Sequence, residues 1–84
     1  MGYRIKTVSE LTGIPKNTIV AWERRYGVVD PQREANGYRV YSQADIAVLE
    51  QLKSALGAGL KISEAVDLVR RRSEREAPAA TEQD

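Results

Sequence analysis

Apolar residues recur at helical spacing in four segments of the chain. The inward positions of the four predicted helices are Val8 and Leu11, then Ile19, Trp22 and Tyr26, then Ile46, Leu49, Leu52 and Leu56, and finally Ile62, Val66 and Val69. A spacing of three or four residues places side chains on one face of a helix. The pattern therefore predicts a mainly helical chain in which these faces form the core.

The first two predicted helices are short and joined by a tight turn. Thr7 and Glu10 have the spacing of a capping box at the start of the first helix. Gly13 is expected to end that helix, because glycine readily adopts the left-handed conformation found at helix ends. Pro15 lies at or near the first position of the second helix, which runs to Gly27. Two helices joined in this way form a helix-turn-helix. A three-helix bundle with one charged face is the alternative.

Two short stretches predict a small β component. Residues 3–6, YRIK, alternate apolar and basic side chains, as a short half-buried strand does. Asn36-Gly37 lies between QREA and YRVY and favours a two-residue type I′ hairpin turn, because both positions tolerate positive φ. A hairpin after a helix-turn-helix is a wing. The predicted fold class is mainly α with a small β wing: a winged helix-turn-helix of four helices plus a short hairpin.

The C-terminal part of the sequence predicts two more helices and a tail. Ser42 and Asp45 have capping-box spacing at the start of the third helix, and the fourth runs from about residue 62 to 72. The remaining stretch, SEREAPAATEQD, lacks large apolar residues and is expected to be disordered. We therefore expect a winged helix-turn-helix domain over residues 1–72 and a linker or tail over residues 73–84.

Composition excludes several classes of function. The 84 residues contain no cysteine and no histidine, which removes disulfides, thiolate metal sites and the usual general base. Paired carboxylates or a phosphate-cradling glycine loop are absent at any suggestive spacing, so we expect no enzyme activity and no metal site. No apolar run is long enough to span a membrane, and no signal peptide opens the chain. A cytoplasmic protein is expected.

Charge is distributed unevenly along the chain. Residues 1–41 carry seven Lys/Arg and four Asp/Glu, a balance of +3, whereas residues 42–84 carry six and eight, a balance of −2. This asymmetry favours a polyanionic partner for the N-terminal half. Arg70-Arg71-Arg72 could suggest the same partner, but these residues end a predicted helix, where the dipole favours cations. We interpret them as a solvated helix end.

The motifs TVSELTGIPKNTIVAWERRYG, P-x-R and NGYRVYS together resemble the DNA-binding domain of the MerR family of bacterial transcription regulators. The resemblance covers roughly residues 3–72. AWERRYG is similar to the CarA/CarH/LitR-type repressors of carotenoid synthesis, which respond to light and vitamin B12. At Val20 the sequence departs from the family pattern, which has an arginine before Ala-Trp-Glu.

The resemblance implies partners as well as a fold. It implies double-stranded operator DNA as the ligand, with Tyr38 and Arg39 of the wing on the DNA backbone. In this subgroup an acidic antirepressor can compete with the operator, and a cobalamin-binding region usually follows the domain. No cofactor is expected within these residues. Because the family's dimerisation helix is not found, we expect an isolated N-terminal domain that is a monomer.

The outward face of the second helix supplies the candidate base contacts. Asn17 can pair with adenine, and Lys16 or Arg24 can donate to guanine. Val20 can pack on a thymine methyl group, although isolated apolar residues are also common on protein surfaces. Arg25 lies about 100° around the helix from Arg24, so one should contact bases and the other the backbone.

Two further residues have open alternatives. The fork of Arg39 fits phosphate oxygens, but the side chain could instead form a salt bridge with Glu23 or Glu34. Thr18 is either a phosphate donor or an ordinary surface hydroxyl. The sequence thus predicts a sequence-specific DNA-binding domain of a bacterial regulator that represses carotenoid-synthesis genes. The alternative is an interaction module that binds a DNA-mimicking acidic protein through the same surface.

Overall fold

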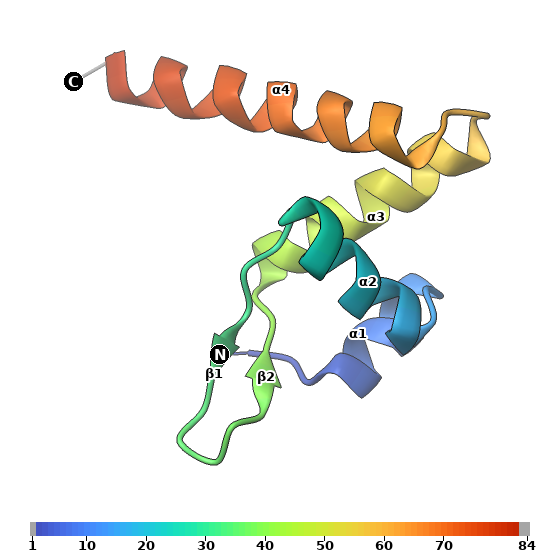
Figure 1. Ribbon diagram of the computed structural model, residues 1–84. Coiled ribbons are helices and arrows are strands. Elements are labelled where there is room, and N and C mark those ends of the chain that lie inside the picture. The colour runs from blue at the N-terminus through green and yellow to red at the C-terminus, as the bar shows by residue number, and fades with distance from the viewer. Residues whose placement is uncertain (1, 83–84) are drawn as a thin grey trace.

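The computed structural model describes the backbone of residues 2–82 and the side chains of residues 2–72. In this part of the chain the elements are α1 (Ile5–Thr12), α2 (Lys16–Tyr26), β1 (Gln32–Arg33), β2 (Arg39–Val40), α3 (Gln43–Gly57) and α4 (Ile62–Glu82). The strands form an antiparallel hairpin that pairs Gln32 with Val40 and Arg33 with Arg39. Figure 1 shows the hairpin and α4 at opposite ends of the molecule. The predicted winged helix-turn-helix is confirmed.

The core is built from the apolar faces of the four helices, from Ile14 in the turn between α1 and α2, and from two residues that flank the hairpin. Its buried members are Val8, Ile14, Ile19, Val29, Tyr41, Ile46, Leu49, Leu52, Ala55, Ala65, Val66 and Val69. Trp22 and Tyr26 are partly buried against them. The inward faces predicted for the second and fourth helices are therefore confirmed. On α3, the inward face includes Ala55, and the predicted Leu56 is partly exposed.

The start of α1 differs from the prediction. Tyr3 forms an isolated bridge with Tyr41, in which each amide donates to the other's carbonyl over 2.8 Å. The predicted strand over residues 3–6 is thus reduced to one residue, because α1 already begins at Ile5. Arg4 is the N-cap and makes no side-chain capping bond, so the predicted capping box at Thr7 is wrong.

The inward face of α1 also differs. Ile5 packs against the core, while Val8 and Thr12 are buried. The Thr12 hydroxyl is satisfied locally, since it donates to the Val8 carbonyl over 2.8 Å. With these three residues inward, Leu11 turns about 90° away from the core on the helical wheel, and its exposed fraction is 57%. The prediction that Leu11 is buried is therefore wrong.

The turn between α1 and α2 is held by bonds to the end of α1. Gly13 is left-handed, with a φ of 77°, and its amide donates to the Ser9 carbonyl over 2.8 Å. The Ser9 hydroxyl donates to the Ile14 carbonyl over 2.6 Å. Lys53 of α3 donates from Nζ to the Thr12 carbonyl over 2.7 Å. The predicted glycine end is confirmed, and a cation from another helix adds to it.

The end of α2 is capped in the same manner. Gly27 is left-handed, with a φ of 61°, as predicted for the helix end. A guanidinium nitrogen of Arg70, on α4, donates to the carbonyl of Tyr26. Arg71 pairs with Asp67 one turn earlier on α4. These arginines are exposed, as interpreted, but they do not end the helix, because α4 continues past them and Arg70 contacts α2.

The hairpin turn is longer than the two-residue turn predicted. The Glu34 amide donates to the Tyr38 carbonyl over 2.9 Å, and the Gly37 amide donates to the Glu34 carbonyl over 2.8 Å. Gly37 has a φ of 89°, and in the part of the chain described only glycines have a positive φ. The loop is thus a turn followed by a left-handed glycine, a common three-residue hairpin connection. Asn36 accepts the Tyr38 amide with its side chain instead of adopting positive φ.

The last two helices, α3 and α4, follow the hairpin in the chain. Ser42 and Asp45 form the predicted capping box at the start of α3, with bonds of 3.0 and 2.9 Å. The prediction ended the fourth helix near Arg72, whereas α4 continues to Glu82. Glutamate and alanine make up six of the ten residues 73–82 and are strong helix formers. The prediction gave more weight to the absence of large apolar residues. That residues 73–84 lie outside the domain stays a prediction, and residues 83–84 lie outside those described.

Trp22→Ala is expected to lower the free energy of unfolding by about 3 kcal/mol, near the lower end of the range for large aromatic truncations, because part of the ring is exposed. Denaturant unfolding followed by circular dichroism measures it. Leu68→Ala is the matched control, because the Leu68 side chain is exposed and its loss should change stability little. An unchanged unfolding midpoint in the Trp22 variant contradicts the packing described.

Comparing Gly13→Ala with Gly27→Ala distinguishes the cost of backbone strain from the cost of losing the lysine cap, which is the bond from Lys53 to the end of α1. Both glycines are left-handed, so an alanine at either should cost about 1–2 kcal/mol. A Cβ at Gly13 would also lie 2.6 Å from Lys53 Nζ, whereas a Cβ at Gly27 meets nothing within 4 Å. The flexible end of Lys53 can move away from this Cβ but would then lose its bond to the Thr12 carbonyl, so Gly13→Ala should destabilise more in thermal unfolding. The difference should vanish in a Lys53→Met background, and its persistence there contradicts a role for the lysine cap.

Candidate nucleic-acid interface

One face of α2 presents polar and basic side chains to solvent. Lys16, Asn17, Arg24 and Arg25 are exposed, and Val20 is partly exposed. The opposite face is anchored by the fully buried Ile19. Rotation of the helix would bring that side chain into water, so the exposed face is fixed. The structure thus brings together, on one helix, the predicted base-contacting residues.

The N-terminus of α2 adds partial positive charge to the same face. Pro15 is the N-cap and offers no capping side chain, and the first turn contains no acidic residue. The helix dipole is therefore not offset there. Thr18 is partly exposed, and its hydroxyl makes no hydrogen bond to the described residues. Both of its predicted roles stay predictions.

A largely buried carboxylate joins the hairpin to α2. Glu23 Oε2 accepts from Arg39 Nε over 3.2 Å, and Glu23 Oε1 accepts from the Tyr41 hydroxyl over 3.0 Å. The exposed fractions of the Arg39 and Glu23 side chains are 22% and 16%. Of the alternatives for Arg39, the salt bridge with Glu23 is present. Arg39 therefore holds the wing against α2, and its contact with a DNA backbone stays a prediction.

Tyr41 is a permanent donor in this cluster. Burial, together with the Glu23 carboxylate beside it, raises the pKa of the Tyr41 phenol well above its ordinary value. The hydroxyl thus stays protonated at neutral pH and keeps donating to Glu23. Since the ring of Tyr41 is fully buried, the cluster is anchored in the core on one side and in α2 on the other.

The tip of the hairpin carries a second ionic cluster. Arg4 Nη2 lies 2.9 Å from Glu34 Oε1, and the Arg4 guanidinium lies 4.4 Å above the centre of the Tyr38 ring. Tyr38 itself is 56% exposed. Arg33 donates from Nη1 to the Gly37 carbonyl over 3.1 Å and so braces the turn. Sequence reasoning did not single out Arg4, because nothing in the YRIK stretch indicates that its side chain reaches Glu34 and Tyr38.

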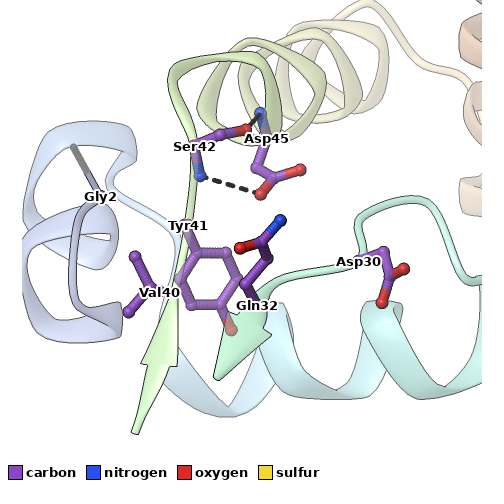
Figure 2. Close-up of a pocket in the computed structure, with 7 residues that line it drawn as sticks. All are labelled: Gly2, Asp30, Gln32, Val40, Tyr41, Ser42 and Asp45. Carbon is purple, nitrogen blue, oxygen red and sulfur yellow. Dashed lines mark hydrogen bonds between the residues drawn. The ribbon is translucent and has the colours of Figure 1, made fainter. Parts of the chain in front are cut away.

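A cavity of about 320 Å³ lies beside the hairpin, where β2 leads into α3. It is lined by Gly2, Asp30, Gln32, Val40, Tyr41, Ser42 and Asp45. Figure 2 shows both Asp30 and Asp45 at this cavity, with Asp45 held by the Ser42 amide. Two carboxylates disfavour an anionic ligand. The cavity is therefore separate in its chemistry from the basic face of α2.

The described residues form neither a metal-binding cluster nor a membrane-spanning helix. Among them, no group of three or more carboxylate, imidazole or thiol side chains is placed to hold a metal ion. No helix that the structure describes combines the length and apolar character needed to cross a membrane.

Comparison with known proteins gives a consistent result. The family model described as "MerR HTH family regulatory protein" matches residues 3–72. The chain is 51% identical over 67 residues to the HTH-type transcriptional repressor CarH of Myxococcus xanthus, covering 80% of this chain and 22% of that protein. It is 42% identical over 82 residues to the repressor CarA of the same organism, covering 95% and 28%. The chain thus spans about a quarter of the length of these relatives.

A solved structure supports the fold independently. A MerR-family transcriptional regulator from Bacillus cereus superposes with a TM-score of 0.75, covering 99% of this chain and 71% of that one at 16% identity. At that identity the likeness concerns the fold alone. The relatives matched by sequence are transcriptional regulators and not enzymes. With the family match covering residues 3–72 and the winged helix-turn-helix in place, the chain belongs to the MerR family of helix-turn-helix regulatory proteins.

Proposed function

We propose that the chain is the sequence-specific DNA-binding domain of a bacterial transcriptional repressor, with α2 in the major groove and the hairpin on the sugar-phosphate backbone. The observation that carries this proposal is the Glu23 link. It holds the exposed face of α2 and the wing in one fixed arrangement. With this arrangement, α2 can enter the major groove while the wing contacts the phosphates beside it. Double-stranded DNA is accordingly the ligand.

The side chains of α2 divide into base and backbone contacts. Asn17 is assigned to adenine, Val20 to a thymine methyl group, and Lys16 or Arg24 to guanine. Arg25, at the edge of this face, is assigned to the backbone. This division is supported by the exposure of these residues on a helix whose opposite face is buried.

The biological setting follows from the resemblance to carotenogenesis repressors. The relatives CarH and CarA are both transcriptional repressors, and repression of carotenoid-synthesis genes in the bacterial cytoplasm is the role assigned to this chain. The cobalamin-binding region implied by the resemblance lies outside these 84 residues. As this chain alone, the domain is a monomer that binds a half-site.

Selection of duplexes from a random pool tests the function. A DNA-binding domain should enrich one motif, and its affinity for that duplex should fall steeply with added salt, because counterions are released from phosphates. A scrambled duplex is the control. Enrichment of no motif contradicts sequence-specific binding. If an acidic protein displaces all DNA and no motif is found, the basic face serves a protein partner instead.

Val20→Ala tests base contact by α2. The loss of two methyl groups should weaken binding to the selected duplex by at most about 1 kcal/mol, leave the scrambled duplex unchanged and keep the salt slope. Fluorescence anisotropy titrations at several salt concentrations measure all three. Leu68→Ala, an apolar truncation on α4, is the control and should change none of them. An equal loss on both duplexes contradicts a thymine contact.

Arg39→Ala tests the backbone contact of the wing. If Arg39 binds a phosphate, its loss should weaken binding on every sequence and flatten the salt slope by about 0.9. The variant also breaks the pair with Glu23, so Glu23→Gln is the matched control: it breaks the same pair but keeps the Arg39 charge. A slope that flattens equally in both variants shows that Arg39 acts only by holding the wing.

A further inference from the structure

We propose that Arg4 is a phosphate-binding residue of the wing, and that Glu34 occupies its guanidinium in the unbound protein. This inference rests on the proposed function and adds a contact that the family match does not assign. In the described structure, Arg4 lies just before α1, whereas Glu34 and Tyr38 flank the hairpin loop. The fold alone brings the arginine to the tip of the wing.

The geometry of Arg4 suits an anionic ligand. Its guanidinium lies 4.4 Å from the centre of the Tyr38 ring, which supports it by a cation–π contact. Nη2 donates to Glu34, and no other guanidinium nitrogen of Arg4 donates to a described residue. A stacked, planar guanidinium with nitrogens to spare is the arrangement that binds phosphate oxygens in a bidentate manner.

A phosphate can replace Glu34 at the Arg4 guanidinium at a small cost in free energy. The exposed fractions of the Arg4 and Glu34 side chains are 52% and 46%, and ion pairs so open to solvent contribute little to stability. A phosphate oxygen carries the same charge as the carboxylate and can take its place. Glu34 therefore competes with DNA for Arg4 and does not hold it permanently.

The other arginines of the hairpin, Arg33 and Arg39, each donate to a less exchangeable partner within the protein. Arg39 donates from Nε to Glu23 and is 22% exposed, less than half the value for Arg4. Arg33 donates to the Gly37 carbonyl inside the turn. Arg4 is thus the wing arginine whose present partner is an exposed acid that a phosphate can replace.

Arg4→Ala in the 84-residue chain tests the contact. Binding to a duplex selected from a random pool and to its scrambled counterpart should weaken several-fold on both, and the salt slope should flatten by about 0.9. Arg71→Ala is the matched control, since Arg71 is also exposed and paired to a carboxylate at 3.0 Å, but on α4. Circular dichroism melting should change little in both variants, because ion pairs as exposed as these two contribute little to stability.

Glu34→Gln tests the competition. It should strengthen binding to both duplexes in the parent chain and have a smaller effect in an Arg4→Ala background. An equal gain in both backgrounds means that Glu34 only repels DNA at a distance, and overturns the exchange.

Two outcomes separate this inference from the proposed function. If Arg4→Ala behaves like Arg71→Ala while Arg24→Ala still loses affinity for the selected duplex, the phosphate contact of Arg4 is overturned and DNA binding by α2 stands. If the parent chain binds neither duplex in a salt-dependent manner, both fail.

Discussion

The arrangement of the wing and α2 depends on one carboxylate. Glu23 is largely buried, and each of its oxygens accepts one bond, from Arg39 and from Tyr41. A carboxylate removed from water is costly unless it is fully paired. The hairpin therefore cannot swing away from α2 without leaving a buried charge. Because Tyr41 also bridges Tyr3, the same constraint reaches the start of the chain and the base of α1.

Side chains of α3 and α4 bind the C-terminal ends of α1 and α2. Lys53 of α3 binds the last carbonyl of α1, and Arg70 of α4 binds the last carbonyl of α2. Each bond adds a positive charge where a helix dipole favours it. The orientation of α2 thus depends on side chains far away in sequence. α3 and α4 carry the more acidic half of the chain, yet they supply the cations that fix its basic half.

Some features decided by local chemistry could be predicted from the sequence, although the capping box at Thr7 and the two-residue turn at Asn36-Gly37 were also local predictions and were wrong. Features decided by distant partners could not be predicted. Gly13, Gly27 and the capping box at Ser42 were predicted because backbone geometry and near neighbours determine them. The extent of the first strand was missed because Tyr3, which lies just before α1, pairs with Tyr41, a partner distant in the sequence. The exposed face of α2 followed from periodicity. Neither the choice of Glu23 over Glu34 by Arg39 nor the place of Arg4 carries a local signal.

Ion pairing determines where the excess positive charge of the N-terminal half lies on the surface. Residues 1–41 have a balance of +3. Among the described residues, Glu34 pairs with Arg4 and Glu23 pairs with Arg39, so both acids compensate bases associated with the wing. Glu23 is the sole acid of α2 and turns toward the wing, and Lys16, Arg24 and Arg25 form no ion pair with the described residues. These three bases are therefore grouped on α2, whereas two of the arginines at the wing, Arg4 and Arg39, are paired with acids.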